Sequence, residues 1–408
     1  MSSLTYTPPP QILERYADVL VNFALGGGAG IKPGDVVRVA AHEYAKPLYA
    51  ELLRAIWRAG GHAITQYLPD DDEEYRLSRD FYELAGDDQI DFFPERYMRG
   101  LVDQLDHQVF VISTTDPQAL KGVDPKRIMR TGKAMKPWMD WRMEKENAGR
   151  FTWTLGLYGT PAMAAEAGLD LEDYWQQIID ACFLDEDDPI ARWREVSGQI
   201  TDHVERLSAL PIDRLHVEGE DVDLWITLGE KRQWVGGSGR NIPSFEIFTS
   251  PDWRGTEGWI RFNQPLYRYG NLVRDVRLEF EGGRVVRATA AENAAVLEEM
   301  VATENADKVG EFSLTDRRFS RITKFMAETL YDENVGGPFG NTHIALGSSY
   351  HDAYAGDPDG VAKEEWARLG FNDSSVHTDI VSTADRTVTA TLRDGSERVI
   401  YRDGEFQL

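Results

Sequence analysis

The chain of 408 residues carries 44 lysine and arginine side chains against 69 aspartate and glutamate side chains, which gives a net charge of −25. This charge repels nucleic-acid phosphates and anionic lipids, and no run of about 18 apolar residues is present to span a bilayer. The first ten residues lack the basic and apolar regions of a secretory signal, and a single cysteine, Cys182, excludes an internal disulfide. The sequence therefore predicts a cytoplasmic protein that binds neither nucleic acid nor membranes.

The first half of the chain alternates helical and strand-like segments. Apolar residues have helical spacing over residues 12–23 and 47–59, and the stretch 163–208 is also expected to be helical. Short apolar runs that predict strands occupy residues 36–41, 63–68, 108–113 and 152–157. Strands separated by helices favour right-handed crossovers and parallel pairing. We expect residues 1–208 to form an α/β N-terminal domain with a mainly parallel sheet.

The second half has a different pattern, in which strand-like segments follow one another with short turns between them. The predicted strands cover residues 222–228, 273–280, 284–289, 387–392 and 398–401, and two helices are predicted at residues 292–304 and 322–330. The dipeptides Gly282-Gly283, Asp394-Gly395 and Asp403-Gly404 supply residues that tolerate hairpin turns. We expect residues 209–408 to form an α+β domain with mostly antiparallel strands.

Several catalytic classes are excluded by their missing motifs. The chain has no GxSxG nucleophile elbow and no HExxH zinc helix, and one cysteine cannot build a structural zinc site. A buried packing role also explains Cys182 better than a nucleophilic role does. What remains is a site made of carboxylates and imidazoles that are dispersed along the chain. Such a ligand set is typical of hydrolases that use two metal ions.

The candidate ligands lie in the second half of the chain. Glu246 and Glu311 each interrupt an apolar, strand-like run, where a carboxylate is costly unless it is paired or binds a cation. Taken singly, an exposed strand face accounts for either glutamate better than a metal ligand does. His377 and Asp379 are two residues apart, so both side chains lie on one face of a strand. Imidazole and carboxylate groups are the ligands that hydrolytic divalent metals use.

A run of motifs in a fixed order resembles the aminopeptidase T-like family of metallopeptidases. The motifs are Asn241-x-Pro243 leading to Glu246, Phe248-Thr249-Ser250-Pro251, Gly310-Glu311-Phe312, Leu330-Tyr331-Asp332-Glu333-Asn334, His343-Ile344-Ala345-Leu346-Gly347 with Tyr350, and His377-Thr378-Asp379. The first half matches more loosely, and the resemblance covers nearly the whole chain. One departure is Phe245, which stands where the family usually has a small residue.

The resemblance implies a set of site residues and an assembly. The implied metal ligands are Glu246, Glu311, Glu333, His343, His377 and Asp379, and Tyr350 is implied at the active site. Glu311 is expected to bridge the ions or to transfer the proton, and Tyr350 to donate a hydrogen bond to the oxyanion. The resemblance also implies a homodimer whose sites face a shared internal cavity.

The residue chemistry and the resemblance together predict a metal-dependent aminopeptidase. It would release N-terminal residues from peptides through a water molecule activated by two divalent ions, which could be Zn, Co, Mn or Mg. Two alternatives stay open. One is another metal-dependent amide hydrolase, with a pocket reshaped by Phe245. The other is a non-catalytic protein in which bound metal only stabilises the fold.

Overall fold

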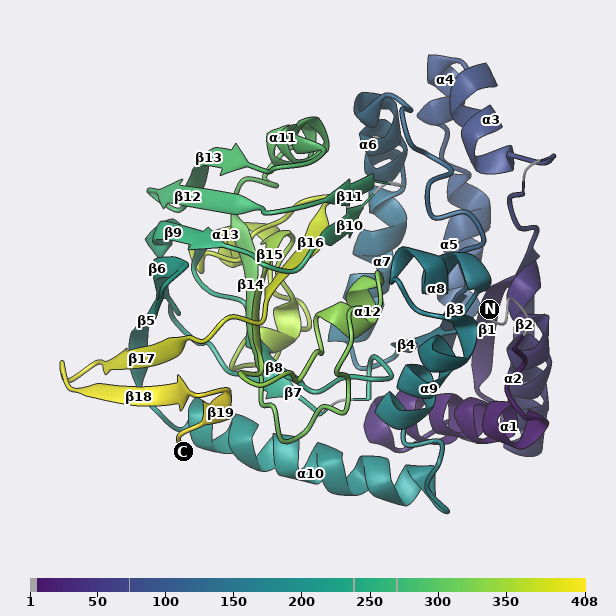
Figure 1. Cartoon of the computed structure of the whole chain (residues 1–408), viewed down its shortest axis with the longest axis horizontal. Coiled ribbons are helices and arrows are strands. Elements are labelled where there is room, and N and C mark those ends of the chain that lie inside the picture. The colour runs from purple at the N-terminus through teal and green to yellow at the C-terminus, as the bar shows by residue number, and fades with distance from the viewer. Residues whose placement is uncertain (1–5, 73, 238, 269–270) are drawn as a thin grey trace.

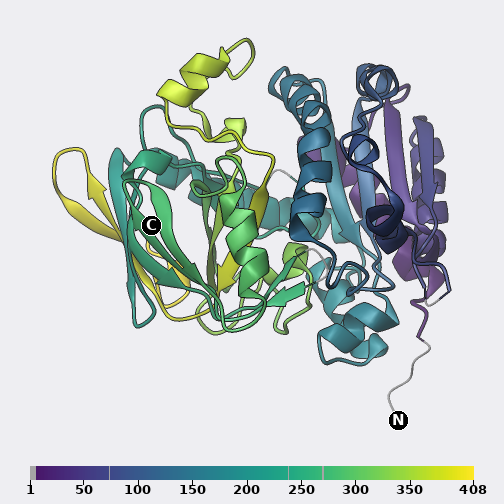
Figure 2. The ribbon, with the colours of Figure 1, turned by 90° about the horizontal axis from the view of Figure 1, so that it is seen from above.

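The computed structural model describes residues 6–72, 74–237, 239–268 and 271–408. Half of the ten-residue segment considered for a secretory signal lies outside these ranges. Two parts of different architecture lie side by side, as Figures 1 and 2 show from two directions. Parallel pairing in the first part and antiparallel pairing in the second confirm the predicted fold class.

The first part is built on a four-stranded parallel sheet with the order β2-β1-β3-β4. Its strands are β1 (Val36–His42), β2 (His62–Leu68), β3 (His107–Ile112) and β4 (Thr152–Leu157). The helices of this part are α1 (Pro10–Val19), α2 (Lys46–Arg58), α3 (Leu77–Leu84), α4 (Asp87–Ile90), α5 (Glu95–Gln104), α6 (Pro125–Ala134) and α7 (Lys136–Asn147). The strand predicted at residues 152–157 is confirmed as β4.

Three helices follow β4 and lead to the second part. They are α8 (Pro161–Glu166), α9 (Leu171–Ala181) and α10 (Pro189–Ser208). Asp170 and Asp188 each cap a helix by accepting a backbone N–H, at the starts of α9 and α10. Cys182 directly follows α9 and is fully buried, 3.4 Å from the Tyr331 hydroxyl. Burial raises the pKa of its thiol to about 12, which agrees with the predicted packing role.

The second part contains two larger antiparallel sheets and a two-stranded hairpin. The eight-stranded sheet has the order β13-β12-β9-β6-β5-β17-β18-β19, the five-stranded sheet has the order β16-β15-β14-β8-β7, and β10 pairs with β11. The strands are β5 (Ile212–Gly219), β6 (Val222–Thr227), β7 (Val235–Gly236), β8 (Glu246–Thr249), β9 (Glu257–Arg261), β10 (Leu266–Arg268), β11 (Asn271–Val273), β12 (Arg277–Glu281), β13 (Arg284–Thr289), β14 (Val309–Thr315), β15 (Asn341–Gly347), β16 (His377–Ser382), β17 (Thr387–Leu392), β18 (Glu397–Arg402) and β19 (Glu405–Phe406). The helices are α11 (Ala294–Ala302), α12 (Thr329–Asp332) and α13 (Lys363–Arg368).

The helix predicted at residues 322–330 is wrong. Only the short α12 is helical there, although Ile322 and Met326 are buried. Side chains take the place of helical carbonyls, because Asp332 accepts the backbone N–H groups of Met326 and Glu328. Polar side chains that bind backbone amides stabilise a turn in competition with a helix. The strand predicted at 273–280 is also interrupted, at Asp275, where φ is +56°.

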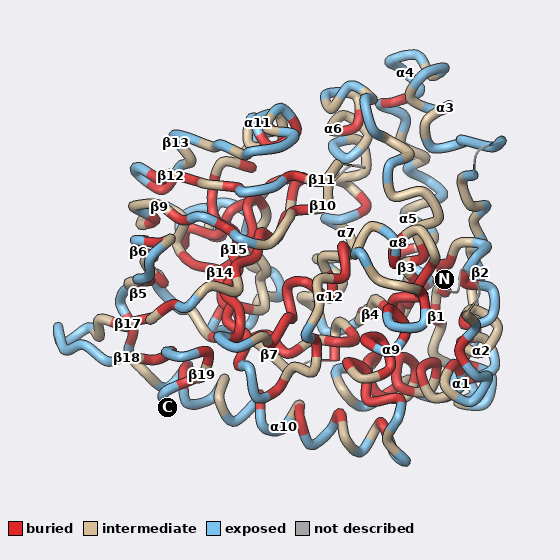
Figure 3. The backbone as a smooth tube through the Cα atoms, in the orientation of Figure 1, coloured by how far each residue is buried: buried red, intermediate tan, exposed pale blue. Residues whose placement is uncertain are grey.

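The two parts share one continuous hydrophobic cluster. α10 runs beneath both of them in Figure 1, and Trp193 on this helix stacks on Phe245 of the second part. Figure 3 shows β14 and β15 among the buried parts of the chain, and every residue of these two strands is buried. The predicted domain boundary at residues 208/209 falls between α10 and β5, and the division into two domains stays a prediction.

Over the described residues, no helix combines the length and the apolar composition needed to cross a membrane.

Candidate metal centre

Four neighbouring strands of the five-stranded sheet carry five of the six predicted ligands. Glu246 begins β8, Glu311 lies on β14, His343 on β15, and His377 and Asp379 on β16. The register pairs Thr315 with Glu246, Ser313 with His343 and Ala345 with Asp379. Because side chains alternate between the two faces of a strand, all five side chains lie on one face of the sheet.

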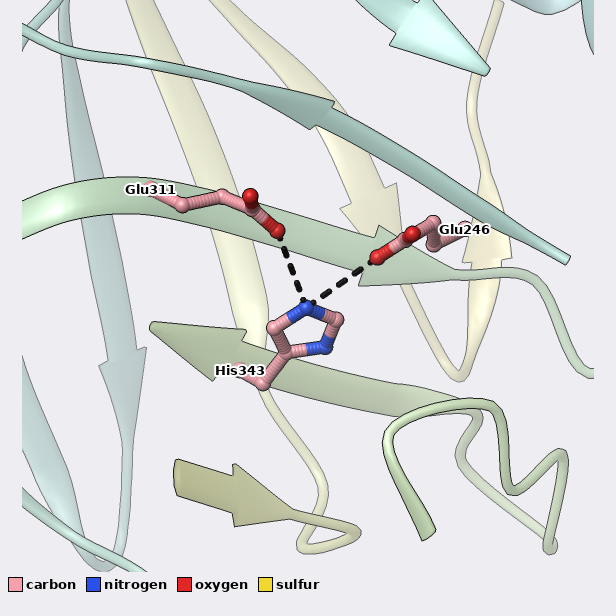
Figure 4. A group of neighbouring side chains, drawn as sticks. All are labelled: Glu246, Glu311 and His343. Atoms are coloured by element: carbon pink, nitrogen blue, oxygen red, sulfur yellow. Dashed lines mark hydrogen bonds and ion pairs between the residues drawn. The ribbon is translucent and has the colours of Figure 1, made fainter. Parts of the chain in front are cut away.

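Two groups of ligand atoms form on this face, and Glu311 belongs to both of them. The first contains Glu246, Glu311 and His343, and the second contains Glu311, His377 and Asp379; within each group the ligand atoms lie within 4.8 Å of one another. In the first group, His343 Nε2 lies 3.2 Å from Glu246 Oε2 and 3.3 Å from Glu311 Oε1 (Figure 4). In the second, His377 Nε2 lies 3.7 Å from Glu311 Oε2 and 3.5 Å from Asp379 Oδ1.

The sixth predicted ligand, Glu333, directly follows α12 and lines the same cavity as Glu246, Glu311, His377 and Asp379. It is 6% exposed, and it belongs to neither of the two groups. Two asparagines hold its position: Asn341 Nδ2 donates to the Glu333 carbonyl at 2.6 Å, and Asn334 Nδ2 lies 3.4 Å from Glu333 Oε1. The structure therefore brings all six predicted residues to one region.

Both imidazoles present Nε2 to the carboxylates and use Nδ1 elsewhere. His377 Nδ1 donates to the Ser348 carbonyl at 2.8 Å, which fixes the tautomer with a free Nε2 lone pair in the neutral ring. His343 Nδ1 lies 3.4 Å from Asn341 Oδ1. A ring nitrogen held by an oxygen acceptor is the usual support for a histidine that binds a metal through its other nitrogen.

Burial and mutual repulsion strongly affect the pKa values of the acidic side chains in the site. Burial, together with the charges of Glu246 and Asp379, raises the pKa of Glu311 to about 7. The same causes, burial first, raise the pKa of Glu333 well above its ordinary range. Burial would also raise the pKa of Asp379, but the neighbouring imidazolium of His377 outweighs it and lowers that pKa. A buried cluster of carboxylates that repel one another is stabilised by added positive charge.

The imidazoles supply part of that positive charge when they are protonated. Burial favours their neutral form, yet hydrogen bonds to Glu246 and Glu311 raise the pKa of His343 well above its ordinary value. The charge of Asp379 similarly outweighs burial and raises the pKa of His377 to about 9. Protons therefore occupy the positions that cations would take, and metal binding must displace them.

The donor set fits divalent metal ions. Four carboxylates and the His377 imidazole line one small cavity, and His343 Nε2 lies against Glu246 and Glu311 of the same set. Glu311 belongs to both groups of ligand atoms. Carboxylates and imidazoles grouped in this way would hold a divalent ion, which would supply the activation of water for hydrolysis. Oxygen and imidazole ligands of this kind suit Zn, Co, Mn and Mg.

The wall of the cavity contains Tyr350, the other residue implied at the active site. Its ring packs edge-on to the His377 ring with centroids 4.7 Å apart, and its backbone N–H donates to Ser250 Oγ at 2.9 Å. Burial, and then the charges of Glu311 and Asp379, raise the pKa of its hydroxyl well above the ordinary value. The hydroxyl therefore stays protonated and able to donate a hydrogen bond.

Phe245 does not contribute to the cavity wall. Its ring is fully buried and stacks on Trp193, with centroids 5.4 Å apart, and it meets Phe183 edge-on. Its backbone N–H donates to Asn334 Oδ1 at 2.6 Å. The larger side chain thus fills the core behind β8, and the geometry gives no support for a pocket reshaped by Phe245.

The cavity wall also contains residues from outside the predicted site, most of which carried no recognisable signal in the sequence. They are Trp153, Gly236, Gly237, Arg240, Ser244 and Phe248, together with Asn241. Only Asn241 and Phe248 belong to motifs that pointed to the site. Trp153 comes from β4 in the first part and reaches the cavity because Asn241 forms a β-bridge with Leu155. A contact of this kind depends on tertiary packing, so no local pattern announces it.

Comparison with known proteins shows which family this chain belongs to. The family model described as thermophilic metalloprotease (M29) matches residues 10–406, and the chain belongs to this family. This membership confirms the resemblance seen in the motifs and places the chain among metallopeptidases.

Similar proteins include several aminopeptidases. Aminopeptidase 2 of Geobacillus stearothermophilus is 28% identical over 97% of both chains. Aminopeptidase T of Thermus aquaticus is 31% identical over 72% of this chain and 75% of its own. The solved structure of wild-type AmpT from Thermus thermophilus superposes with a TM-score of 0.81 at 25% identity, and covers 98% of this chain and 99% of its own.

Proposed function

We propose that this chain is a metal-dependent aminopeptidase that removes N-terminal residues from peptides and uses two divalent ions per chain. The observation that carries the proposal is the pair of ligand groups that share Glu311 on one buried sheet face. The similarity to aminopeptidases over nearly the full chain supports the choice of substrate. The six residues Glu246, Glu311, Glu333, His343, His377 and Asp379 would hold the ions.

The bound ions would polarise the scissile carbonyl and lower the pKa of a water molecule. The protein's own groups would carry out the remaining steps. Glu311 would either bridge the two ions or take the proton of the attacking water and pass it to the departing amine. The Tyr350 hydroxyl would donate a hydrogen bond to the oxygen that becomes negative, an effect of a few kcal/mol for donors of this kind. The high pKa of Tyr350 supports this role.

Two further parts of the proposal rest on the family resemblance. In a homodimer whose sites face a shared cavity, only peptides and short stretches of polypeptide would reach the sites. The net charge of −25 suits such a chamber, because it would attract divalent ions and positively charged N-termini. The cytoplasm is the proposed compartment, which agrees with one buried, unpaired cysteine.

Hydrolysis of leucyl-anilide by chelator-treated protein tests the proposal. We expect no activity until Zn²⁺, Co²⁺, Mn²⁺ or Mg²⁺ is returned, with two ions per chain by elemental analysis. N-acetyl-leucyl-anilide, which lacks the free amine, should not be cleaved.

Glu311→Gln should abolish the activity, while Glu279→Gln on the distant strand β12 is the matched control and should retain it. Cleavage of the acetylated substrate or of simple acyl amides would favour another amide hydrolase. Two bound ions that only raise the melting temperature, with no turnover, would favour a non-catalytic metal protein. Absence of bound metal would refute the ligand assignment.

A further inference from the structure

One arginine in the cavity wall is held by two carboxylates outside the predicted ligand set. Arg240 Nη1 donates to Asp352 Oδ2 and Arg240 Nη2 donates to Glu146 Oε1, both at 2.6 Å. The Arg240 side chain is 20% exposed and lines the cavity that contains the predicted ligands. Two short charge-assisted hydrogen bonds fix the plane of a guanidinium group as well as its position.

This guanidinium packs against Tyr350. Its central carbon lies 5.6 Å from the centroid of the Tyr350 ring and 5.4 Å from that of Trp153. The same Tyr350 ring contacts His377 edge-on, at 4.7 Å, and Phe248 at 5.7 Å. The Tyr350 ring therefore lies among the guanidinium, one predicted ligand and one apolar ring, and its backbone is held by Ser250.

The supporting groups come from both parts of the chain. Glu146 lies in the last turn of α7 and Trp153 lies on β4, whereas Arg240, Tyr350 and Asp352 belong to the second part. The next residue of α7, Asn147, also contacts the second part, because its Nδ2 lies 3.0 Å from His351 Nδ1. The end of α7 is thus attached to the segment that carries Tyr350 directly through Asn147, and indirectly through Arg240, which links Glu146 to Asp352.

We propose that Arg240 is a positioning residue that fixes the Tyr350 hydroxyl where negative charge develops, and that Glu146 of the first part holds Arg240 in place for this task. The inference rests on the proposed function, because it needs Tyr350 as a hydrogen-bond donor. A donor of this kind is effective only if it is already oriented before the reaction, and a displacement of about 1 Å can cost about a hundredfold in rate. The first part of the chain then contributes to catalysis through Glu146.

A double-mutant cycle with Arg240→Met and Tyr350→Phe tests this directly. We expect Arg240→Met to lower kcat by about 10- to 100-fold with KM changed less than about threefold. In the Tyr350→Phe background the same substitution should change kcat by less than about twofold, because the hydroxyl that Arg240 positions is gone. Glu146→Gln should show the same dependence on Tyr350 with a smaller effect. Arg240→Lys should recover little, since one ammonium group cannot reproduce the planar, two-sided bridge.

A second readout separates positioning from general damage. Binding of leucine hydroxamate to the metal-loaded protein, measured by calorimetry, should be unchanged in Arg240→Met, because the predicted ligands do not depend on Arg240. The control is Arg38→Met, since Arg38 also packs on a tryptophan, Trp138, and donates to Gln66 and Gln108 in the first part, away from the cavity. Arg38→Met should leave kcat unchanged both with Tyr350 present and in the Tyr350→Phe background.

Each other outcome overturns a specific claim. Equal losses from Arg240→Met with Tyr350 present and in the Tyr350→Phe background would make Arg240 a structural residue. Weaker hydroxamate binding would place its effect on the metal centre. An unchanged kcat in Tyr350→Phe alone would refute the role of Tyr350 in the proposed function, which is distinct from a failure of the positioning inference. If Arg240→Met does not fold, the cycle of Glu146→Gln with Tyr350→Phe decides the same question.

Discussion

Glu311→Gln should stabilise the metal-free protein at alkaline pH, although it is expected to destroy the metal site. Glu311 is 3% exposed and lies among Glu246, Asp379 and two imidazoles. Burial is the main cause that raises its pKa from 4.5 to about 7. Because the pKa is higher in the folded state, this group's contribution to stability is complete below pH 4.5 and is lost as the pH rises through about 7.

The magnitude follows from the same pKa values. The gap between 4.5 and about 7 corresponds to about 3 kcal/mol, at about 1.4 kcal/mol per pKa unit. Glutamine has nearly the same shape and no charge, so metal-free Glu311→Gln should be more stable than the parent by up to this amount at about pH 8. With an unfolding entropy of about 2.1 cal/mol/K per residue, the melting temperature should rise by about 3 to 4 °C if the whole chain melts together. The rise should be about 7 °C if about 200 residues melt as one unit.

Differential scanning calorimetry of chelator-treated protein at about pH 4.5 and about pH 8 measures this difference. At the lower pH it should nearly vanish, because the carboxyl group is then largely protonated in the folded parent. Added Zn²⁺ should reverse the order at the higher pH, since binding to the parent alone adds about 4.1 kcal/mol at about a thousandfold excess over Kd, which exceeds the gain from the substitution. Glu279→Gln, which removes a carboxylate paired with Arg277 at 3.1 Å, should not show the reversal by Zn²⁺.

The reasoning would be refuted if metal-free Glu311→Gln melted at or below the parent temperature at the higher pH. That result would mean that the two imidazoles already compensate the carboxylate, and that the fold does not depend on an added cation at this point. A stabilisation of equal size at both pH values would instead assign the effect to packing.

Three further predictions concern groups around the site and in the core. Phe245→Ala should lower the free energy of unfolding by about 3–5 kcal/mol, because it leaves a cavity against Trp193; calorimetry measures this loss. KM should stay unchanged, because the Phe245 ring does not line the site. Arg386→Met should lower the free energy of unfolding by about 3–5 kcal/mol, because it leaves the charge of Asp221, 3.0 Å from Arg386, without its partner. Chemical denaturation measures this loss. As a check, the double variant with Asp221→Asn should recover stability. Burial raises the pKa of Glu328 from 4.5 to about 7. The contribution of this group to stability is therefore complete below pH 4.5 and is lost above about pH 7. Glu328→Gln should raise the melting temperature at about pH 8 and leave it unchanged at about pH 4.5.

Local patterns in the sequence were enough for most strands and for the chemistry of the ligands. Buried strands such as β1 and β3 are short apolar runs, and the period of two in a strand placed His377 and Asp379 on one face. The ordered motifs indicated the family, which the match over residues 10–406 confirms. The helix predicted at residues 322–330 does not form over residues 322–328, because Asp332 accepts the backbone N–H groups of Met326 and Glu328.

Tertiary structure decided how the ligands are grouped and what surrounds them. The register of β8, β14, β15 and β16 brings five of the six predicted ligands to one face and makes Glu311 common to two groups. Packing buried Phe245 in the core. It also brought Trp153 to the cavity wall and Glu146 to Arg240, from segments that belong to none of the motifs. The physical reason is range: a residue's type and its strand face follow from its near neighbours, whereas its partners across the cavity follow from how whole strands and helices pack.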